Sequence, residues 1–111
     1  MFVCLKLALQ APEVLQLDSH GGGGVRQPKK YTNKADMWSL GCVLYSLLCG
    51  SPAFHGNNTE ELEDSILRGD VNLHGRRWRL ISAEAKDLVS RLLQTNSRKR
   101  ISAKDALQHD W

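Results

Sequence analysis

The sequence predicts an all-α fold, and three observations support this class. Residues 36–48 form an apolar run of helical length that ends shortly before Gly50. Residues 82–93 repeat apolar side chains at the i, i+3, i+4 spacing of a helix with one buried face. No segment shows a convincing alternation of apolar and polar residues, which would indicate a strand. With 41% hydrophobic residues, the chain has enough apolar surface for a packed core.

The N-terminal part is expected to hold one short helix between two irregular segments. We predict this helix over residues 11–17, because Pro12 suits a first helical turn. Residues 1–10 are apolar but carry Lys6 in their middle, whereas a signal peptide has its charge ahead of the apolar run. Residues 18–30 contain four consecutive glycines, which predict a long surface loop.

The central apolar run predicts a helix that is buried on every side. We expect it to begin near Thr32 or Asn33, either of which could cap it, and to end at Cys49. A helix that is apolar all round belongs inside a larger protein or in a membrane, and this run is shorter than the roughly 20 residues that a bilayer requires. Asp36 is expected in the first turn, where it would face the positive end of the helix dipole.

Three further helices are predicted from caps and apolar faces. Residues 59–68 follow the cap candidates Asn58 and Thr59, and Gly69 is the expected stop. Ser82 caps the helix over residues 82–93, and Ser102 opens the last helix. The apolar face of the first of these helices consists of Leu62, Ile66 and Leu67. Between the helices predicted at residues 59–68 and 82–93, Trp78 lies in an irregular stretch and is expected to pack in the core.

Five short motifs occur in a fixed order along the chain. They are Ala11-Pro12-Glu13, Asp36-x-Trp38-Ser39-x-Gly41, Gly50-Ser51-Pro52-Ala53-Phe54, Arg100 placed four residues after Asn96, and His109-Asp110-Trp111. In this order they resemble the large lobe of eukaryotic serine/threonine protein kinases, from the end of the activation segment to the last helix. Residues 81–88 are most similar to the calcium/calmodulin-dependent group, which includes calcium-dependent and checkpoint kinases.

The resemblance implies structural roles for the motif residues. Glu13 and Arg100 resemble the buried ion pair between the end of the activation segment and the loop before the last helix. Asp36 resembles the residue that anchors the catalytic loop in the family. In an intact relative, ATP and magnesium would be the cofactors, and a serine or threonine of a protein substrate would accept the phosphate. Such an enzyme is expected in the cytoplasm or nucleus.

The motifs that hold ATP and magnesium do not occur in this sequence. A kinase uses a Gly-rich loop, a strand lysine, a catalytic-loop aspartate and an Asp-Phe-Gly, and none is present. We therefore predict a partial large lobe over residues 11–111, with the small lobe absent and a Gly-rich insertion at 18–30. Residues 1–10 do not resemble the family. No catalytic, cofactor-binding or metal-binding residue is predicted, and the chain alone is expected to be inactive.

Two alternatives from other functional classes remain open. One is a non-catalytic protein-binding module that uses the acidic helix at residues 59–68, with Glu60, Glu61, Glu63 and Asp64 on its surface. The other is a small basic helical domain that binds nucleic acid, since the net charge is +3 and basic residues cluster at 76–79 and 98–100. Nucleic-acid binding is the less favoured, because only Trp78 interleaves with these charges. No membrane association is expected.

The cysteines agree with an intracellular compartment. Cys4, Cys42 and Cys49 are odd in number and lack the spacing of a metal site. Buried thiols in a reducing cytosol or nucleus are the favoured interpretation.

Overall fold

The computed structural model describes residues 9–19 and 29–111, and these residues confirm the all-α class. They contain α-helices and one short 3-10 helix, without a strand in either range. The helices are α2 (Pro12–Ser19), α3 (Lys29–Cys49), α4 (Thr59–Arg68), the 3-10 helix η1 (Arg76–Trp78), α5 (Ala83–Leu92) and α6 (Ala103–Leu107).

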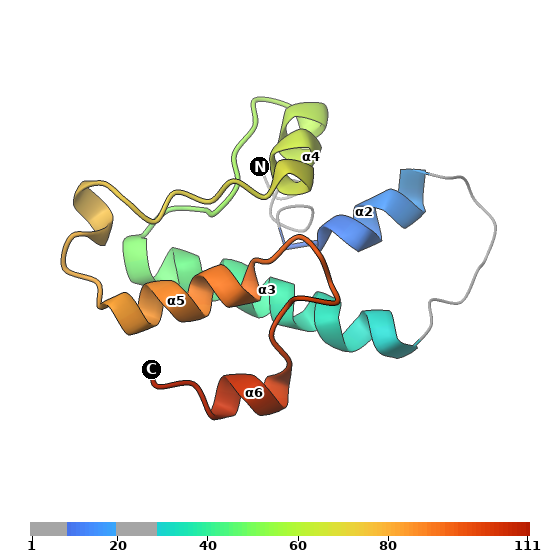
Figure 1. Cartoon of the computed structure of the whole chain (residues 1–111). Coiled ribbons are helices and arrows are strands. Elements are labelled where there is room, and N and C mark those ends of the chain that lie inside the picture. Colours follow the sequence, from blue (N-terminus) through green and yellow to red (C-terminus); the bar gives the residue numbers. More distant parts are fainter. Residues whose placement is uncertain (1–8, 20–28) are drawn as a thin grey trace.

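The long helix α3 is the centre of the molecule (Figure 1). α5 packs along it, and α2 and η1 also contact it, while α2 reaches α4 as well. Gly41 permits the close approach of α3 and α5, because a Cβ atom there would lie 2.8 Å from the Leu92 Cβ and 2.9 Å from the Leu93 Cδ2. A residue with a side chain at this position would force the two helices apart.

Two aromatic pairs build much of the core around α3. The rings of Trp38 and Phe54 stack with centroids 5.3 Å apart and planes inclined by 10°. The rings of Tyr45 and Trp78 meet at 4.8 Å with a tilt of 56°. Trp78 is only 3% exposed, which confirms the prediction that it packs in the core. These pairs fix the segments on both sides of α4 against α3.

The start of α3 differs from the prediction. The helix begins at Lys29, before Thr32 and Asn33, so neither residue caps it. Consequently the first turn holds no acid, and Asp36 lies about two turns inside the helix, where it is exposed. The prediction was wrong because it followed the apolar residues, whereas the lysines upstream favour a helix without contributing to an apolar pattern.

The prediction that α3 is buried on every side is also wrong for this chain. Leu40, Val43 and Leu47 are 50%, 43% and 78% exposed, and their spacing places them on one face of the helix. The opposite face, with Trp38 and Cys42, is buried. The apolar sequence therefore predicted a helix covered on all sides, whereas the described residues of this chain cover only one face of α3.

The caps of the later helices agree with the sequence. The Asn58 side chain accepts a hydrogen bond from the Glu61 N–H at 2.9 Å, so Asn58 and not Thr59 caps α4. Ser82 and Ser102 accept the corresponding bonds at 3.1 and 3.2 Å. Gly69 ends α4 in the left-handed conformation, with φ at 68°, which glycine adopts without strain.

The apolar face of α4 is narrower than predicted. Leu62 and Ile66 are buried, whereas Leu67 is 41% exposed.

Part of the predicted N-terminal organisation lies outside the described residues. This applies to residues 1–8 and 20–28, which include most of the predicted glycine loop. Residues 18–19 belong to α2 and residues 29–30 to α3, so the ends of the segment 18–30 are helical. Within the described parts of the chain, no helix has both the length and the apolar character needed to cross a membrane.

Candidate functional site

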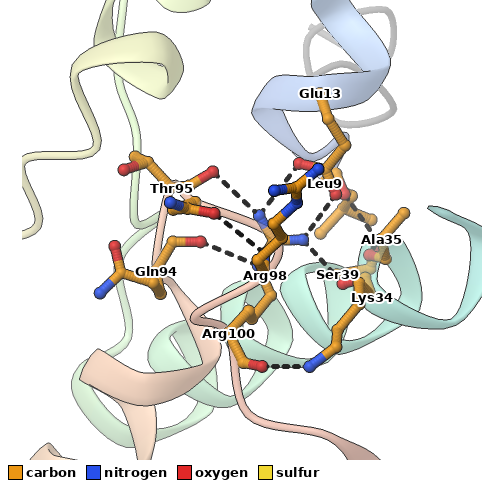
Figure 2. Close-up of polar contacts among 10 residues, drawn as sticks. Leu9, Glu13, Lys34, Ala35, Ser39, Gln94, Thr95, Arg98 and Arg100 are labelled. Carbon is orange, nitrogen blue, oxygen red and sulfur yellow. Dashed lines mark hydrogen bonds and ion pairs between the residues drawn. The ribbon is translucent and has the colours of Figure 1, made fainter. Parts of the chain in front are cut away.

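The candidate site is centred on Arg100, which is 1% exposed and lies in the loop between α5 and α6. A turn at Asn96 brings this residue into the core. The N–H groups of Lys99 and Arg100 both donate to the Asn96 carbonyl oxygen at 3.0 Å, and the Arg98 N–H donates to the Asn96 side chain at 3.0 Å. The loop is thereby folded back so that the guanidinium points toward α2 and α3 (Figure 2).

All five N–H donors of the Arg100 guanidinium have an acceptor. Nε donates to the Gln94 carbonyl at 2.8 Å. Nη1 donates to Glu13 Oε1 at 2.6 Å and to the Lys34 carbonyl at 2.8 Å. Nη2 donates to Glu13 Oε2 at 3.0 Å and to the Thr95 carbonyl at 3.4 Å. Burying a cation is costly unless it is paired and hydrogen-bonded, and this set of partners meets that condition.

Glu13 supplies the negative charge from the first turn of α2. Its two carboxylate oxygens face the two terminal nitrogens of Arg100, which is the bidentate arrangement that gives a strong charge-assisted pair. The side chains are 10% and 0% exposed, so solvent screens the pair only weakly. The ion pair joins residues that are 87 positions apart in the sequence and attaches α2 to the rest of the fold.

Further hydrogen bonds on α3 surround this ion pair. The Lys34 ammonium donates to the Arg100 carbonyl, so the two residues exchange hydrogen bonds in both directions. The Ser39 hydroxyl lies 2.6 Å from the Leu9 carbonyl and 3.2 Å from the Ala35 carbonyl. Sequence reasoning missed Lys34, and it included Ser39 in a motif without predicting its contacts, because the Arg100 and Leu9 acceptors are distant backbone carbonyls that no side-chain pattern reveals.

Trp38 connects the ion pair to the apolar core. The Arg100 guanidinium carbon lies 5.0 Å from the centroid of the Trp38 ring, within the range of a cation–π interaction. The ring is fully buried and also stacks on Phe54. Its Nε1–H has no hydrogen-bond partner within the described parts of the chain.

The other predicted motif residues have distinct places. Ala11 is 1% exposed, and its carbonyl accepts from the Val14 and Leu15 N–H groups at 3.0 and 3.2 Å, which starts α2. Pro12 lies in the first turn of that helix, as expected, although the helix begins at Pro12 and not at the predicted Ala11. Gly41 lies farther along α3 at its contact with α5.

Asp36 does not join the Arg100 centre. It lines an open cavity of about 910 Å³ between the N-terminal part of α3 and the segment that carries α6, together with Arg98 and Lys104. Its predicted dipole role in a first turn is not available, because the helix begins earlier.

The predicted acidic surface on α4 contains exposed carboxylates, but one of them is used to cap the helix. Glu60, Glu61 and Asp64 are exposed, and Glu63 is half-buried. The carboxylate of Glu61 accepts from the Asn57 N–H at 2.8 Å, while its own N–H donates to Asn58. Glu61 therefore takes part in a capping arrangement at the start of the helix.

A second polar cluster fixes the C-terminal segment on α5. The Asp87 carboxylate accepts from His109 Nε2 at 2.8 Å and from Arg91 Nε at 2.7 Å. The Trp111 N–H donates to His109 Nδ1 at 3.1 Å, so a neutral ring carries its proton on Nε2. The hydrogen bond from His109, and then that from Arg91, lowers the pKa of Asp87.

The chemistry of the described residues is that of a structural centre. Burial raises the pKa of the Cys42 thiol to about 12, so this thiol is not a nucleophile at neutral pH. Within residues 9–19 and 29–111, no group of three or more His, Cys, Asp or Glu side chains could hold a metal ion. The Arg100 centre has the geometry to organise three helical segments.

Known proteins resemble this chain in both sequence and fold. A family model described as the protein kinase domain matches residues 2–111. This match includes most of residues 1–10, whose assignment outside the family stays a prediction. The probable serine/threonine-protein kinase fhkD of Dictyostelium discoideum is 40% identical over 102 residues, which cover 91% of this chain and 14% of that protein. Calcium-dependent protein kinase 2 of Oryza sativa subsp. japonica is 43% identical over 101 residues, covering 91% of this chain and 17% of its own length.

Solved kinase structures also resemble this chain in fold. A crystal structure of Rad53 1-466 in complex with AMP-PNP matches with a TM-score of 0.78 and 34% identity, covering 95% of this chain and 25% of that one. A structure of the Rad53 kinase domain and SCD2 matches with a TM-score of 0.78 and covers 36% of that chain. The chain thus spans 14–17% of the length of the curated relatives named here.

Proposed function

Because the chain belongs to the protein kinase domain family, and within it to the serine/threonine kinases of the calcium/calmodulin-dependent group, we propose that it forms the structural scaffold of a kinase large lobe. The whole enzyme would transfer the γ-phosphoryl group of ATP to a serine or threonine of a protein substrate, with magnesium. The residues of this chain would hold the helical framework on the substrate side and would not contact the reacting phosphate.

The observation that carries this proposal is the Arg100 centre. A cation with five satisfied donors ties the start of α2 to α3 and to the loop before α6. Such a centre fixes the relative positions of segments, and catalysis by positioning depends on such rigidity. The motif Ala11-Pro12-Glu13, which resembles the end of an activation segment, is held in place by this pair.

We further propose that this chain alone does not catalyse phosphate transfer. The sequence lacks the Gly-rich loop, the strand lysine and the Asp-Phe-Gly aspartate that hold ATP and magnesium in the family, and it also lacks the catalytic-loop aspartate that accepts the substrate proton. Purified chain mixed with ATP, magnesium and a basic peptide is expected to transfer no phosphate, with an active Rad53 kinase domain as the positive control. Phosphate transfer by the purified chain would contradict this proposal.

The scaffold role can be tested with a chimera. Residues 9–111 would replace the corresponding part of the Rad53 kinase domain, and AMP-PNP would be added while the melting temperature is followed. The proposal expects AMP-PNP to raise the melting temperature of the chimera, since binding to the native state stabilises it. A chimera that melts cooperatively but gives no such shift would argue against a complete kinase fold.

The alternative functions receive less support than the scaffold. The acidic surface of α4 remains a candidate protein-binding site, but Glu61 is engaged in capping. Trp78 is buried and is therefore not offered for base stacking, which disfavours nucleic-acid binding. A cytoplasmic or nuclear location stays part of the proposal, and imaging of a fluorescent fusion in intact cells tests it.

A further inference from the structure

Three arginines surround one buried tryptophan on the turn between α4 and α5. Arg76, Arg77 and Arg79 are exposed, while Trp78 between them is 3% exposed. Leu80, which follows, is 94% exposed. We name residues 75–80 the basic turn. Neither the Arg100 centre nor the capping of the neighbouring helices uses these arginine side chains.

The backbone of the basic turn is held in one conformation. Trp78 packs its ring against Tyr45, and the Tyr45 hydroxyl donates to the Asn72 carbonyl at 2.8 Å. The Trp78 N–H donates to the Gly75 carbonyl at 3.2 Å, and the Ile81 N–H donates to the Trp78 carbonyl at 3.2 Å. The arginines therefore extend from a fixed base, which reduces the entropy lost when a partner binds.

The charges of the basic turn are uncompensated within the described parts of the chain. None of its arginines forms an ion pair there, whereas Arg100 pairs with Glu13 and Arg91 pairs with Asp87. Cations this close in sequence repel one another, and an anionic partner would relieve that repulsion. The basic turn consequently has both the charge and the free donors to bind an acidic ligand.

We propose that the basic turn binds an acidic protein segment that carries an apolar side chain beside its carboxylates. The guanidinium fork matches a carboxylate in a bidentate geometry. Leu80 offers the apolar contact next to Arg79. The inference does not depend on the proposed kinase function, because the binding groups belong to this turn and Tyr45 of α3 only holds the turn in place.

Two other classes of anionic partner fit the turn less well. Single-stranded nucleic acid is usually bound by exposed aromatic rings between basic residues, and the aromatic ring here is buried. A membrane surface is bound by an amphipathic helix with a broad apolar face, whereas the turn presents a 3-10 helix of three residues and the single exposed leucine.

The test measures binding of short fluorescein-labelled probes to the full chain by fluorescence anisotropy. The first probe is a peptide that alternates glutamate and leucine, and the second replaces each glutamate with glutamine. A labelled single-stranded oligonucleotide is the third probe, and vesicles containing phosphatidylserine are the fourth, with binding of the chain to the vesicles measured by co-sedimentation. The variant Arg76→Gln/Arg77→Gln/Arg79→Gln removes the proposed site. The control Arg68→Gln/Lys99→Gln/Lys104→Gln removes the same charge from other exposed positions.

The proposal expects the glutamate peptide to bind in preference to the other three probes. Its affinity should fall with added salt and by about tenfold or more in the site variant, since several ion pairs are lost together. The control variant should bind like the parent chain, and a Leu80→Asn variant should bind the peptide more weakly. Circular dichroism checks that each variant is folded. Equal weakening in both triple variants, or tighter binding of the oligonucleotide or the vesicles, would overturn the proposal.

Discussion

Replacing Glu13 with alanine tests the ion pair at the Arg100 centre. The substitution leaves the Arg100 cation at 1% exposure, with Lys34, Gln94 and Thr95 carbonyls as its only acceptors among the described residues. Breaking a buried ion pair by removing one partner costs about 3–5 kcal/mol, because the remaining charge is uncompensated. Solvent screening does not reduce this cost much, because the Arg100 side chain is 0% exposed and the Glu13 side chain is 10% exposed.

The expected loss is large relative to the stability of a small domain. The free energy of unfolding of such domains is about 5–15 kcal/mol, so a loss of about 3–5 kcal/mol would remove a large part of it. Urea unfolding followed by tryptophan fluorescence measures the change, since Trp38 lies next to Arg100. Glu84→Ala is a suitable control, because Glu84 is also an acid in the first turn of a helix but is exposed.

A double-mutant cycle separates the ion pair from the packing of the individual side chains. Glu13→Ala, Arg100→Met and the double variant would be compared with the parent chain. We expect the double variant to be much more stable than the sum of the single losses predicts, because it leaves no unpaired buried charge. A Glu13→Ala variant whose free energy of unfolding stays within about 0.5 kcal/mol of the parent would refute the reasoning, since that is the usual size of surface effects.

Three further results are expected. Gly41→Ala should destabilise the fold in urea unfolding by up to about 2 kcal/mol. Its new methyl would meet Leu92 at 2.8 Å and Leu93 at 2.9 Å, and such overpacking costs typically about 1–3 kcal/mol, from which the roughly 1 kcal/mol gained in helix propensity is subtracted. The hydrogen bond from His109 lowers the pKa of Asp87 in the folded state. The ionised Asp87 carboxylate therefore stabilises the fold above its unfolded pKa of about 4, and this stabilisation is lost as the pH falls through the lower pKa of the folded state. Asp87→Asn should therefore flatten the acid limb of the stability profile measured by circular dichroism, and an unchanged limb would count against the interaction. The exposed apolar face of α3 predicts that the isolated chain aggregates. Leu47→Gln should reduce this aggregation in light scattering without loss of stability, since the Leu47 side chain is 78% exposed, and unchanged aggregation would show that the apolar face of α3 is not responsible.

The sequence predicted those helices whose ends carry local signals. Asn58, Ser82 and Ser102 each cap a helix through their own side chain, and Gly69 ends one with a conformation that favours glycine. Such signals act over three or four residues, so they can be recognised in the sequence without knowledge of the fold. At α3 the cap-type residues Thr32 and Asn33 were misleading, because the helix already begins at Lys29, and the predicted start was therefore wrong.

Long-range contacts were predictable only where the family resemblance supplied them. The motifs implied that Glu13 and Arg100 approach each other, and in the structure Glu13 Oε1 lies 2.6 Å from Arg100 Nη1. The exchange of hydrogen bonds between Lys34 and Arg100 was not predicted, because backbone carbonyls are acceptors at every position and carry no sequence pattern. The exposure of Leu47 was missed for a related reason: hydropathy indicates that a side chain favours burial, but it does not identify what covers it.

The most direct measurement of the scaffold role is phosphate transfer by the chimera in which residues 9–111 replace the corresponding part of the Rad53 kinase domain. We predict that the chimera phosphorylates a basic peptide in the presence of ATP and magnesium, and that adding Glu13→Ala reduces this activity together with stability. A chimera that folds cooperatively and binds AMP-PNP, yet transfers no phosphate, would contradict the conclusion that this chain supplies the scaffold of a functional kinase large lobe.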